Sequence, residues 1–335
     1  MRHLTSLGAR LETWVASRNP WSNGYGLPRT LLALSTLLTL VFSPVAGLFR
    51  PGVGVLEAPI CQGASRAGIF CLGSHHLEAT RWIVVILLAI VASGWRPRVT
   101  ALLHVWIVLS VQFNALMVDG GDQVCQVLTL LLLPVALSDR RVWHWFQPDD
   151  DSDARPFARV LALSTLVAIQ IQVAGIYFHA AIAKFSVPEW VDGTALYYWL
   201  LDGPFGAPHW LGAPLGLLLR SGTASALVCW SVLLLEYLLS AALLMPEGFR
   251  RPLLVVAVTF HAAIAVTLGL VSFGLAMTAA IFLYLRPLAR PFALPTAVGR
   301  RRPGSKQEAK IAVDLVPVGH SDVTAQSAPH RAHLS

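Results

Sequence analysis

The chain has 335 residues, of which 55% are hydrophobic and 13% are charged, and its mean hydropathy is +0.62. A soluble domain carries about 25% charged residues, so this composition excludes an ordinary water-soluble protein and indicates a membrane protein. Period-2 alternation is absent, which argues against a transmembrane β-barrel. The net charge of +7 comes from arginines beside apolar stretches. We expect these arginines to set membrane topology and not to bind nucleic acid.

The apolar stretches predict an all-α, polytopic transmembrane helix bundle of about eight spans, because about 20 apolar residues are needed to cross a hydrocarbon core of roughly 30 Å. The spans are expected at Leu27–Phe49, Arg81–Gly94, Val99–Val118, Gln123–Leu137, Phe157–Ala183, Thr223–Met245, Pro252–Leu268 and Leu270–Leu285. The last two are joined near Gly269, and a single re-entrant hairpin is an alternative there.

Two flanking segments complete the predicted organisation. Residues 1–27 are polar and aromatic and predict a cytoplasmic N-terminal segment, with no cleavable signal peptide. Residues 28–290 then form the transmembrane domain. Residues 291–335 are rich in Pro, Ser, Arg and Ala, which predicts a disordered cytoplasmic tail.

The distribution of positive charge predicts that both termini lie on the cytoplasmic side of the cell membrane. With the N-terminus inside, all but five of the 25 Lys and Arg residues fall in inner segments, the bias that the positive-inside rule demands. The five expected outside are Arg50, Arg66, Arg81, Lys184 and Arg220.

Four cysteines divide into two groups. Cys61 and Cys71 lie in the outer loop after the first predicted span, on an oxidising face, so a local disulfide is expected. The alternatives are two unpaired thiols or a redox-active pair, although the spacing is not CxxC. Cys125 and Cys229 fall within spans and are interpreted as small apolar core residues. The histidines that follow Cys71 lack the spacing of a zinc site, and no metal site is predicted.

Lys184 is a candidate for chemistry because the other two lysines, Lys306 and Lys310, are in the tail, and arginine takes every other basic position. A partly desolvated lysine can lose its proton and act as a base, which arginine cannot. The alternative is an interfacial anchor whose charge reaches the headgroups. Helical spacing puts Tyr177 on the same face as Lys184, two turns away, and His179 on a different face.

Glu236 and His261 are ionisable residues expected near mid-membrane. Each lies about nine residues, roughly 14 Å at 1.5 Å per residue, from the inner end of its span. Equal depth on consecutive antiparallel helices predicts a Glu–His hydrogen bond. It would act as a proton relay or substrate contact, or else as a structural pair that holds the bundle together.

A polar cluster is expected where the third predicted span turns into the fourth. Gly120 and Gly121 allow the reversal, and Asp122 can cap the following helix. Asn114 lies in the same outer layer, as does Lys184, so we also expect a contact between Lys184 and Asp122.

The stretch from Tyr177 to Leu196, YFHAAIAKFSVPEWVDGTAL, resembles the signature of the HTTM superfamily, which includes the membrane domain of vitamin K-dependent gamma-carboxylase. Its pattern is an aromatic helix end, small residues, a lysine, then Trp and Gly. Gly-Gly-Asp at 120–122, Glu236 and Phe260-His261 also look like recurring positions of that superfamily. Within it, the chain is most similar to the bacterial sporulation-delaying protein B family, over roughly residues 28–290.

The resemblance implies a membrane protein that helps to produce a secreted toxin-like peptide beside a small SdpA-like partner protein. In the carboxylase relatives, a lysine at the position of Lys184 serves as the base in quinol-driven chemistry, so a quinone cofactor is implied by analogy. We expect no counterpart of the carboxylase's large lumenal domain in this sequence, so the resemblance does not imply carboxylation or vitamin K dependence here.

We therefore expect a peptide-maturation factor at the outer face, in contact with membrane lipid and a secreted peptide precursor. The expected catalytic residues are Lys184, Glu236, His261 and Asp122, and the expected substrate-binding residues are Tyr177, Trp190, Asn114 and His179. Two alternatives stay open. One is a non-catalytic scaffold or chaperone for peptide export, and the other is a quinone-linked membrane oxidoreductase or transporter.

Overall fold

The computed structural model describes residues 2–51, 57–146, 156–202, 206–287 and 291–292. Within these ranges the chain is helical and has no β-strand, which confirms the predicted all-α fold class. The predicted disordered tail lies outside the described residues, apart from Pro291 and Phe292.

Nine longer helices account for most of the described chain. They are α1 (Arg2–Ala16), α2 (Asn23–Phe42), α5 (Leu77–Ser93), α6 (Pro97–Asn114), α7 (Gly120–Ser138), α8 (Pro156–Phe185), α12 (Gly222–Ala241), α13 (Glu247–Leu268) and α14 (Val271–Leu285). The shorter α-helices are α3 (Val45–Leu48), α4 (Ile69–Leu72), α9 (Pro188–Val191), α10 (Ala195–Tyr197) and α11 (His209–Leu219). A π-helical turn follows α10 at Tyr198–Asp202.

Each predicted span overlaps one of the long helices from α2 to α14. Within the described ranges, six helical stretches are long and apolar enough to cross a membrane: 23–42, 74–93, 120–138, 156–185, 222–244 and 247–268. The helices α6 and α14 are not among them, and α14 has 15 residues. The number of spans and their orientation therefore stay predictions.

The first predicted span is wrong in its bounds, because α2 begins and ends earlier than Leu27–Phe49. The Ser22 side chain caps the helix by accepting a hydrogen bond from the Gly24 amide at 3.1 Å. Pro44 restricts Ser43 to an extended conformation, which ends the helix at Phe42. The short helix α3 follows the break.

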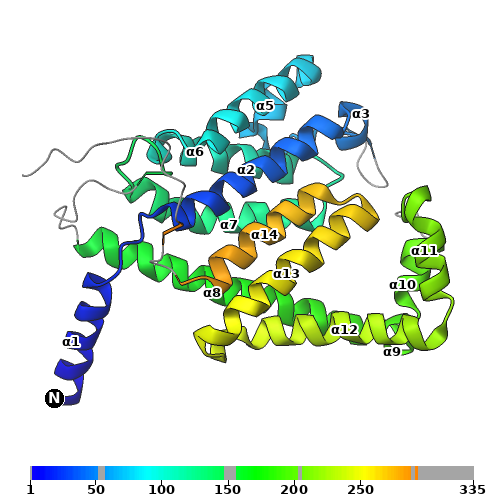
Figure 1. Ribbon diagram of the computed structural model, residues 1–335. Coiled ribbons are helices and arrows are strands. Elements are labelled where there is room, and N and C mark those ends of the chain that lie inside the picture. Colours follow the sequence, from blue (N-terminus) through cyan, green and yellow to red (C-terminus); the bar gives the residue numbers. More distant parts are fainter. Residues whose placement is uncertain (1, 52–56, 147–155, 203–205, 288–290, 293–335) are drawn as a thin grey trace, which may run out of the picture. The chain divides into compact units, whose positions relative to one another are not determined.

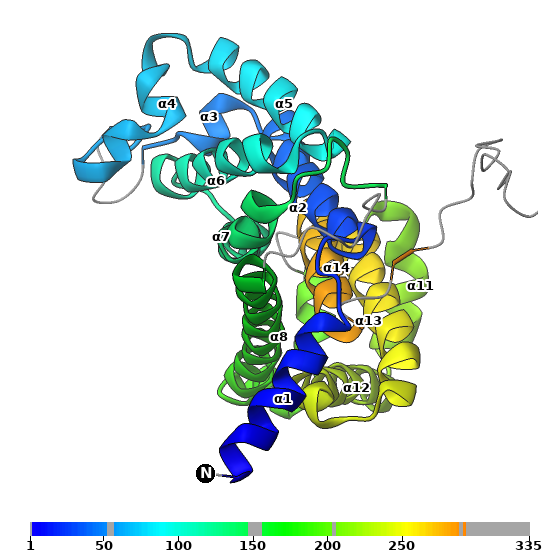
Figure 2. The same cartoon turned by 90° about the vertical axis from the view of Figure 1, so that its left-hand side faces the viewer.

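Helix α14 packs against α2, α7, α8 and α13 (Figures 1 and 2). Its Ala276, Ala279 and Ala280 are fully buried. Small side chains let helix backbones approach closely in membrane proteins. The short, apolar α14 is thus an internal helix, enclosed by longer ones.

Helices α8 and α12 form a second packed pair, α9 and α10 lie beside the first half of α12, and α11 stands across the start of α12 (Figure 1). A small core of Trp190, Ala195, Cys229 and Leu233 joins this short-helix segment to α12. The segment after α8 therefore folds back over α12.

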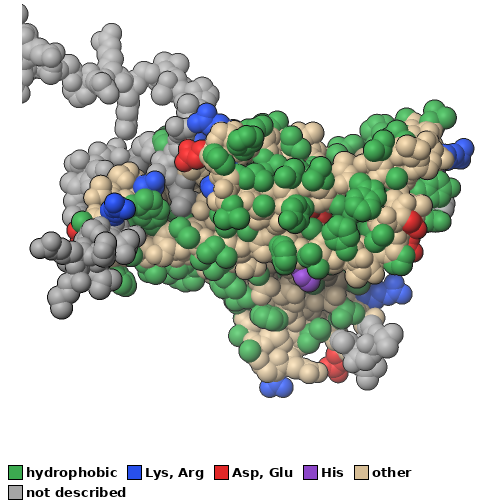
Figure 3. Space-filling view, turned by 90° about the horizontal axis from the view of Figure 1, so that it is seen from below, with side chains coloured by type: hydrophobic (Ala, Val, Ile, Leu, Met, Phe, Trp, Pro, Cys, Tyr) green, Lys and Arg blue, Asp and Glu red, His purple; other side chains and the backbone are tan. Residues whose placement is uncertain are grey.

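The surface of the helices is mostly apolar. Figure 3 shows one face on which hydrophobic side chains predominate and most charged side chains lie near the margins. On α13 the buried residues are Ala257 and His261, while Val255, Val256 and Val266 are exposed. Exposed apolar side chains on long helices suit contact with lipid tails. His261 is thus a buried polar residue on the one side of α13 that packs against the bundle.

Candidate functional site

Lys184 and Glu236 form an ion pair between α8 and α12. Lys184 Nζ donates hydrogen bonds to both carboxylate oxygens of Glu236, at 2.7 and 2.9 Å. The Glu236 side chain is 8% exposed and the Lys184 side chain is 23% exposed. Lys184 lies in the last turn of α8, where the helix dipole also favours a cation. The acid is thus buried, while the lysine side chain is partly exposed.

Trp190 covers the ammonium group. Lys184 Nζ lies 5.3 Å from the centre of the Trp190 ring, within range of a cation–π interaction. The ring is held by the α9–α10 turn, in which Gly193 has φ +81° and its carbonyl accepts a hydrogen bond from Ser225 Oγ at 2.8 Å. A Cβ on Gly193 would lie 2.5 Å from Ala226 Cα, so only glycine permits this approach to α12.

Tyr177 and His261 form a second buried pair, between α8 and α13. A hydrogen bond of 2.9 Å joins Tyr177 Oη to His261 Nε2, and each residue is 2% exposed. His261 Nδ1 is buried and has no hydrogen-bond partner among the described residues. A Cβ at Gly274 of α14 would lie 3.2 Å from the His261 carbonyl oxygen, so a small residue at this position lets α14 pack close to His261.

The predicted hydrogen bond between Glu236 and His261 is wrong, since Glu236 pairs with Lys184 and His261 pairs with Tyr177. Equal depth on two helices does not fix which faces meet. Here helix α8 supplies both partners, Lys184 for Glu236 and Tyr177 for His261. The expected placement of Tyr177 and Lys184 on one face of α8 agrees with the two contacts.

The membrane depths predicted for Lys184 and Glu236 differ, which conflicts with the contact between their side chains. The sequence placed Lys184 at the outer end of a span and Glu236 near mid-membrane, but their side chains touch. Glu236 lies about 21 Å along α12 from Gly222, at 1.5 Å per residue. The chain beyond α8 covers that first part of α12, so the end of α8 is level with the interior of α12.

Asp122 does not reach Lys184, so the expected contact between them is wrong. Asp119 and Asp122 form a reciprocal capping box at the start of α7, and Thr39 donates a hydrogen bond of 3.2 Å to Asp122. The predicted polar cluster around Asp122 is therefore a helix cap that is joined to α2, and it is separate from Lys184.

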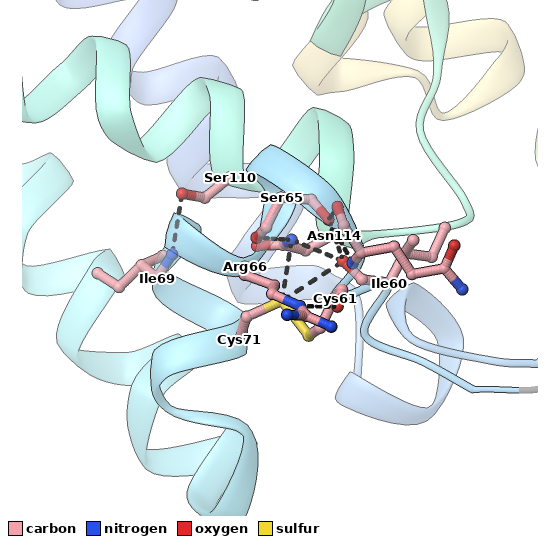
Figure 4. Close-up of a disulfide and its surroundings, with 9 residues drawn as sticks. Ile60, Cys61, Ser65, Arg66, Ile69, Cys71, Ser110 and Asn114 are labelled. Atoms are coloured by element: carbon pink, nitrogen blue, oxygen red, sulfur yellow. Dashed lines mark hydrogen bonds between the residues drawn. A yellow bond between two sulfur atoms is a disulfide. The ribbon is translucent and has the colours of Figure 1, made fainter.

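Asn114 also lies apart from Lys184, beside a disulfide between Cys61 and Cys71 (Figure 4). Its amide nitrogen donates to the carbonyl oxygens of Ile60 and Ser65, each at 3.0 Å, and contacts Cys71 Sγ at 3.2 Å. The residue fixes the disulfide-bonded loop against the end of α6. His179 is exposed and on a different face of α8 from Tyr177.

A buried polar cluster that sequence reasoning did not identify joins α2 to the loop after α7. The Asp139 carboxylate accepts hydrogen bonds from Tyr25 and Arg141, and His144 lies 3.4 Å from Arg29 through its Nδ1. Burial, together with the charges of Arg29 and Arg141, lowers the pKa of His144 to about 2. In the sequence, Arg29 and Arg141 resemble arginines that set membrane topology. No local sequence pattern indicates that their side chains point into the protein.

The two central pairs do not fit a quinone in the arrangement that the structure shows. A quinone needs hydrogen-bond donors at its two carbonyl oxygens, but the polar groups of the central pairs bond to one another. His261 Nδ1 alone would not hold both ends of such a ring.

Long apolar helices that enclose two polar pairs define a multi-pass integral membrane protein with a polar centre. The chain belongs to the HTTM family, since the HTTM domain matches residues 79–288. It is also similar to two proteins of Bacillus subtilis strain 168. Sporulation-delaying protein SdpB is 36% identical over 83% of this chain and 85% of its own length. The uncharacterized protein YitO is 38% identical over 81% of this chain and 87% of its own length. No solved structure matches the chain significantly.

These matches confirm the resemblance to the sporulation-delaying protein B family. All four residues of the two polar pairs lie within the HTTM region, as does Trp190. The disulfide lies outside it, because both Cys61 and Cys71 precede residue 79.

Proposed function

We propose that this protein acts in the maturation of a secreted, toxin-like peptide, with Lys184 as a base. The observation that carries the proposal is the enclosed contact between Lys184 Nζ and both oxygens of Glu236. The similarity to a sporulation-delaying protein supports the peptide context. The substrate is then a peptide precursor presented in the membrane, beside a small SdpA-like partner.

The pair provides a way to deprotonate the amine. Two opposite charges lose hydration when they are buried together. Transfer of one proton from Lys184 to Glu236 makes both groups neutral, and little hydration energy is lost in that step. The carboxylic acid then holds the first proton and donates a hydrogen bond to the amine, and the lone pair of the amine takes a proton from the substrate when that hydrogen bond is broken. Trp190 covers the amine and restricts access to it.

The side chain of Lys184 can be tested by a substitution that keeps its charge. Lys184→Arg retains the ion pair but removes the base, because a guanidinium does not lose its proton in proteins. We expect normal membrane insertion and a loss of active peptide of about 100-fold or more, within the range for general-base catalysis. Glu236→Gln should reduce production similarly, and Glu189→Gln is a matched control because the Glu189 side chain is exposed.

A scaffold is the second candidate, because a closed ion pair also suits a purely structural role. The charge-reversed double variant Lys184→Glu/Glu236→Lys separates the two. A scaffold regains function when the pair is restored in reverse, whereas a base moved to α12 does not act on the same substrate atom. Full activity of Lys184→Arg, or rescue by the reversed pair, would overturn the catalytic proposal.

A further inference from the structure

A cavity of about 530 Å³ lies at the other end of the helix bundle from the α9–α10 turn. The end of α1, the middle of α8, the start of α13 and the end of α14 surround it. Its size is within the range of about 300–1,000 Å³ that is usual for small-molecule sites. None of the residues of the two central pairs lines it.

The lining of this cavity is strongly basic. Arg18, Arg250, Arg251 and Arg286 line it, together with one acidic residue, Glu247. Within the described part of the chain, no carboxylate forms a salt bridge with Arg18, Arg250 or Arg251. The cavity therefore carries an excess of positive charge, which an anionic ligand would neutralise.

Two of the guanidinium groups are held in place by neutral groups. Arg250 donates to the carbonyl oxygens of Met245 and Leu243, at 3.0 and 2.7 Å. Arg18 lies over the ring of Trp14, 4.6 Å from its centre. These contacts orient the side chains without cancelling their charge, so the donors are arranged before a ligand arrives.

The position of the cavity indicates which kind of anion fits. It lies at the start of α13 and the end of α14, and α13 is a helix long and apolar enough to cross a membrane, so the cavity is at the level where this helix leaves the apolar layer. Trp14 adds an aromatic ring of the type that is enriched at the membrane–water interface. Basic pockets between membrane helices bind phosphate-bearing lipid headgroups, and planar guanidinium groups suit phosphate oxygens.

We propose that this arginine pocket binds the phosphodiester headgroup of an anionic phospholipid. Arg18, which follows α1, and Arg251 of α13 contact the phosphate, and Arg250 fixes the pocket at the start of α13. The lipid thereby joins α1 to α13 and α14. This site is separate from the Lys184–Glu236 pair, and the inference does not depend on the proposed peptide chemistry.

The test uses the full-length protein purified in a zwitterionic detergent. Binding of phosphatidylglycerol and of phosphatidylcholine is measured by native mass spectrometry, with inorganic phosphate in a third arm. We expect phosphatidylglycerol to bind at least tenfold more tightly than phosphatidylcholine, and inorganic phosphate not to displace it at millimolar concentration. Equal binding of the two lipids would overturn the proposal. Displacement by phosphate would assign the pocket to a soluble phosphate compound, which also overturns the lipid claim.

The variant Arg18→Gln/Arg251→Gln locates the binding site. We expect it to weaken phosphatidylglycerol binding about tenfold or more, since each basic residue near an anionic headgroup contributes measurably. The matched control Arg10→Gln/Arg220→Gln loses the same charge from two exposed positions outside the pocket and should change binding less than twofold. Equal effects of the two double variants would contradict the assigned site.

A measurement on the wild-type protein guards against misfolding of the variant. A photoreactive phosphatidylglycerol analogue is crosslinked to the protein, and the attachment points are mapped by peptide mass spectrometry. We expect attachment between Trp14 and Arg18 or between Glu247 and Arg251. Attachment confined to other helices would overturn the proposal whatever the variants do.

Discussion

At the scale of single residues, the molecule places polar groups in enclosed pairs and clusters. Lys184 contacts Glu236, Tyr177 contacts His261, and His144 packs within a network around Arg29. Removing one partner of such a pair leaves a buried polar group unsatisfied, which costs about 1–3 kcal/mol for a neutral group. The pairs are therefore important for stability whatever chemistry they perform.

His144 makes the stability of the fold depend on pH. Its pKa is about 2 in the folded protein and about 6.5 when exposed, so the unfolded chain binds a proton that the folded chain does not. Its contribution is complete above pH 6.5 and is lost as pH falls below that value. We expect roughly 2 kcal/mol less stability at pH 5 than at pH 7.5 from this group alone.

The measurement for His144 is thermal unfolding in detergent at several pH values. His144→Gln removes the titrating ring, and we expect the variant to show a smaller loss of stability between pH 7.5 and pH 5 than the wild type. His179→Gln is the control, since His179 is exposed. The explanation fails if the wild type and His144→Gln lose stability in parallel.

At the scale of helices, the short segment after α8 decides how Trp190 meets Lys184. Gly193 has a positive φ and leaves no room for a Cβ against Ala226. Trp190, Ala195, Cys229 and Leu233 then form the small core that holds this segment on α12. The position of the ring over the ammonium group thus depends on one glycine.

Gly193→Ala should separate the α9–α10 turn from α12. Strain at a positive φ and a clash of the new methyl group together should cost about 2–4 kcal/mol. Gly212→Ala in α11 is the control, because an added Cβ there meets nothing within 4 Å. Thermal unfolding of both variants checks the difference, and equal midpoints would contradict the packing described for Gly193.

The sequence predicted helices better than it predicted partners. Apolar runs located every long helix from α2 to α14, because the length and periodicity of such runs are local properties. The partners of Glu236, His261 and Asp122 depend on helix rotation and on the path of the chain after α8, which local patterns do not contain. Of the eight predicted site residues, the structure groups Lys184, Glu236, Tyr177, His261 and Trp190, and places Asp122, Asn114 and His179 elsewhere.

At the scale of the whole molecule, the protein is a multi-pass membrane protein of the HTTM family, whose described residues place the central pairs and the arginine pocket among mostly apolar helices. The central pairs lie where α8 meets α12 and α13, and the arginine pocket lies at the far ends of α13 and α14. If the central pairs are the site of peptide maturation, the arginine pocket anchors helices of the same bundle to the surrounding lipid. The two regions can be inactivated separately.

The most direct test of the account is the intact mass of the secreted peptide. The peptide is collected from cells that carry the wild-type protein, no protein, or Lys184→Arg, and is measured by high-resolution mass spectrometry. We expect one mass for the wild type, and a second mass, or no peptide, shared by the deletion and by Lys184→Arg. A peptide from the Lys184→Arg cells that is identical in mass and yield to the wild-type product would contradict the role of Lys184 as a base.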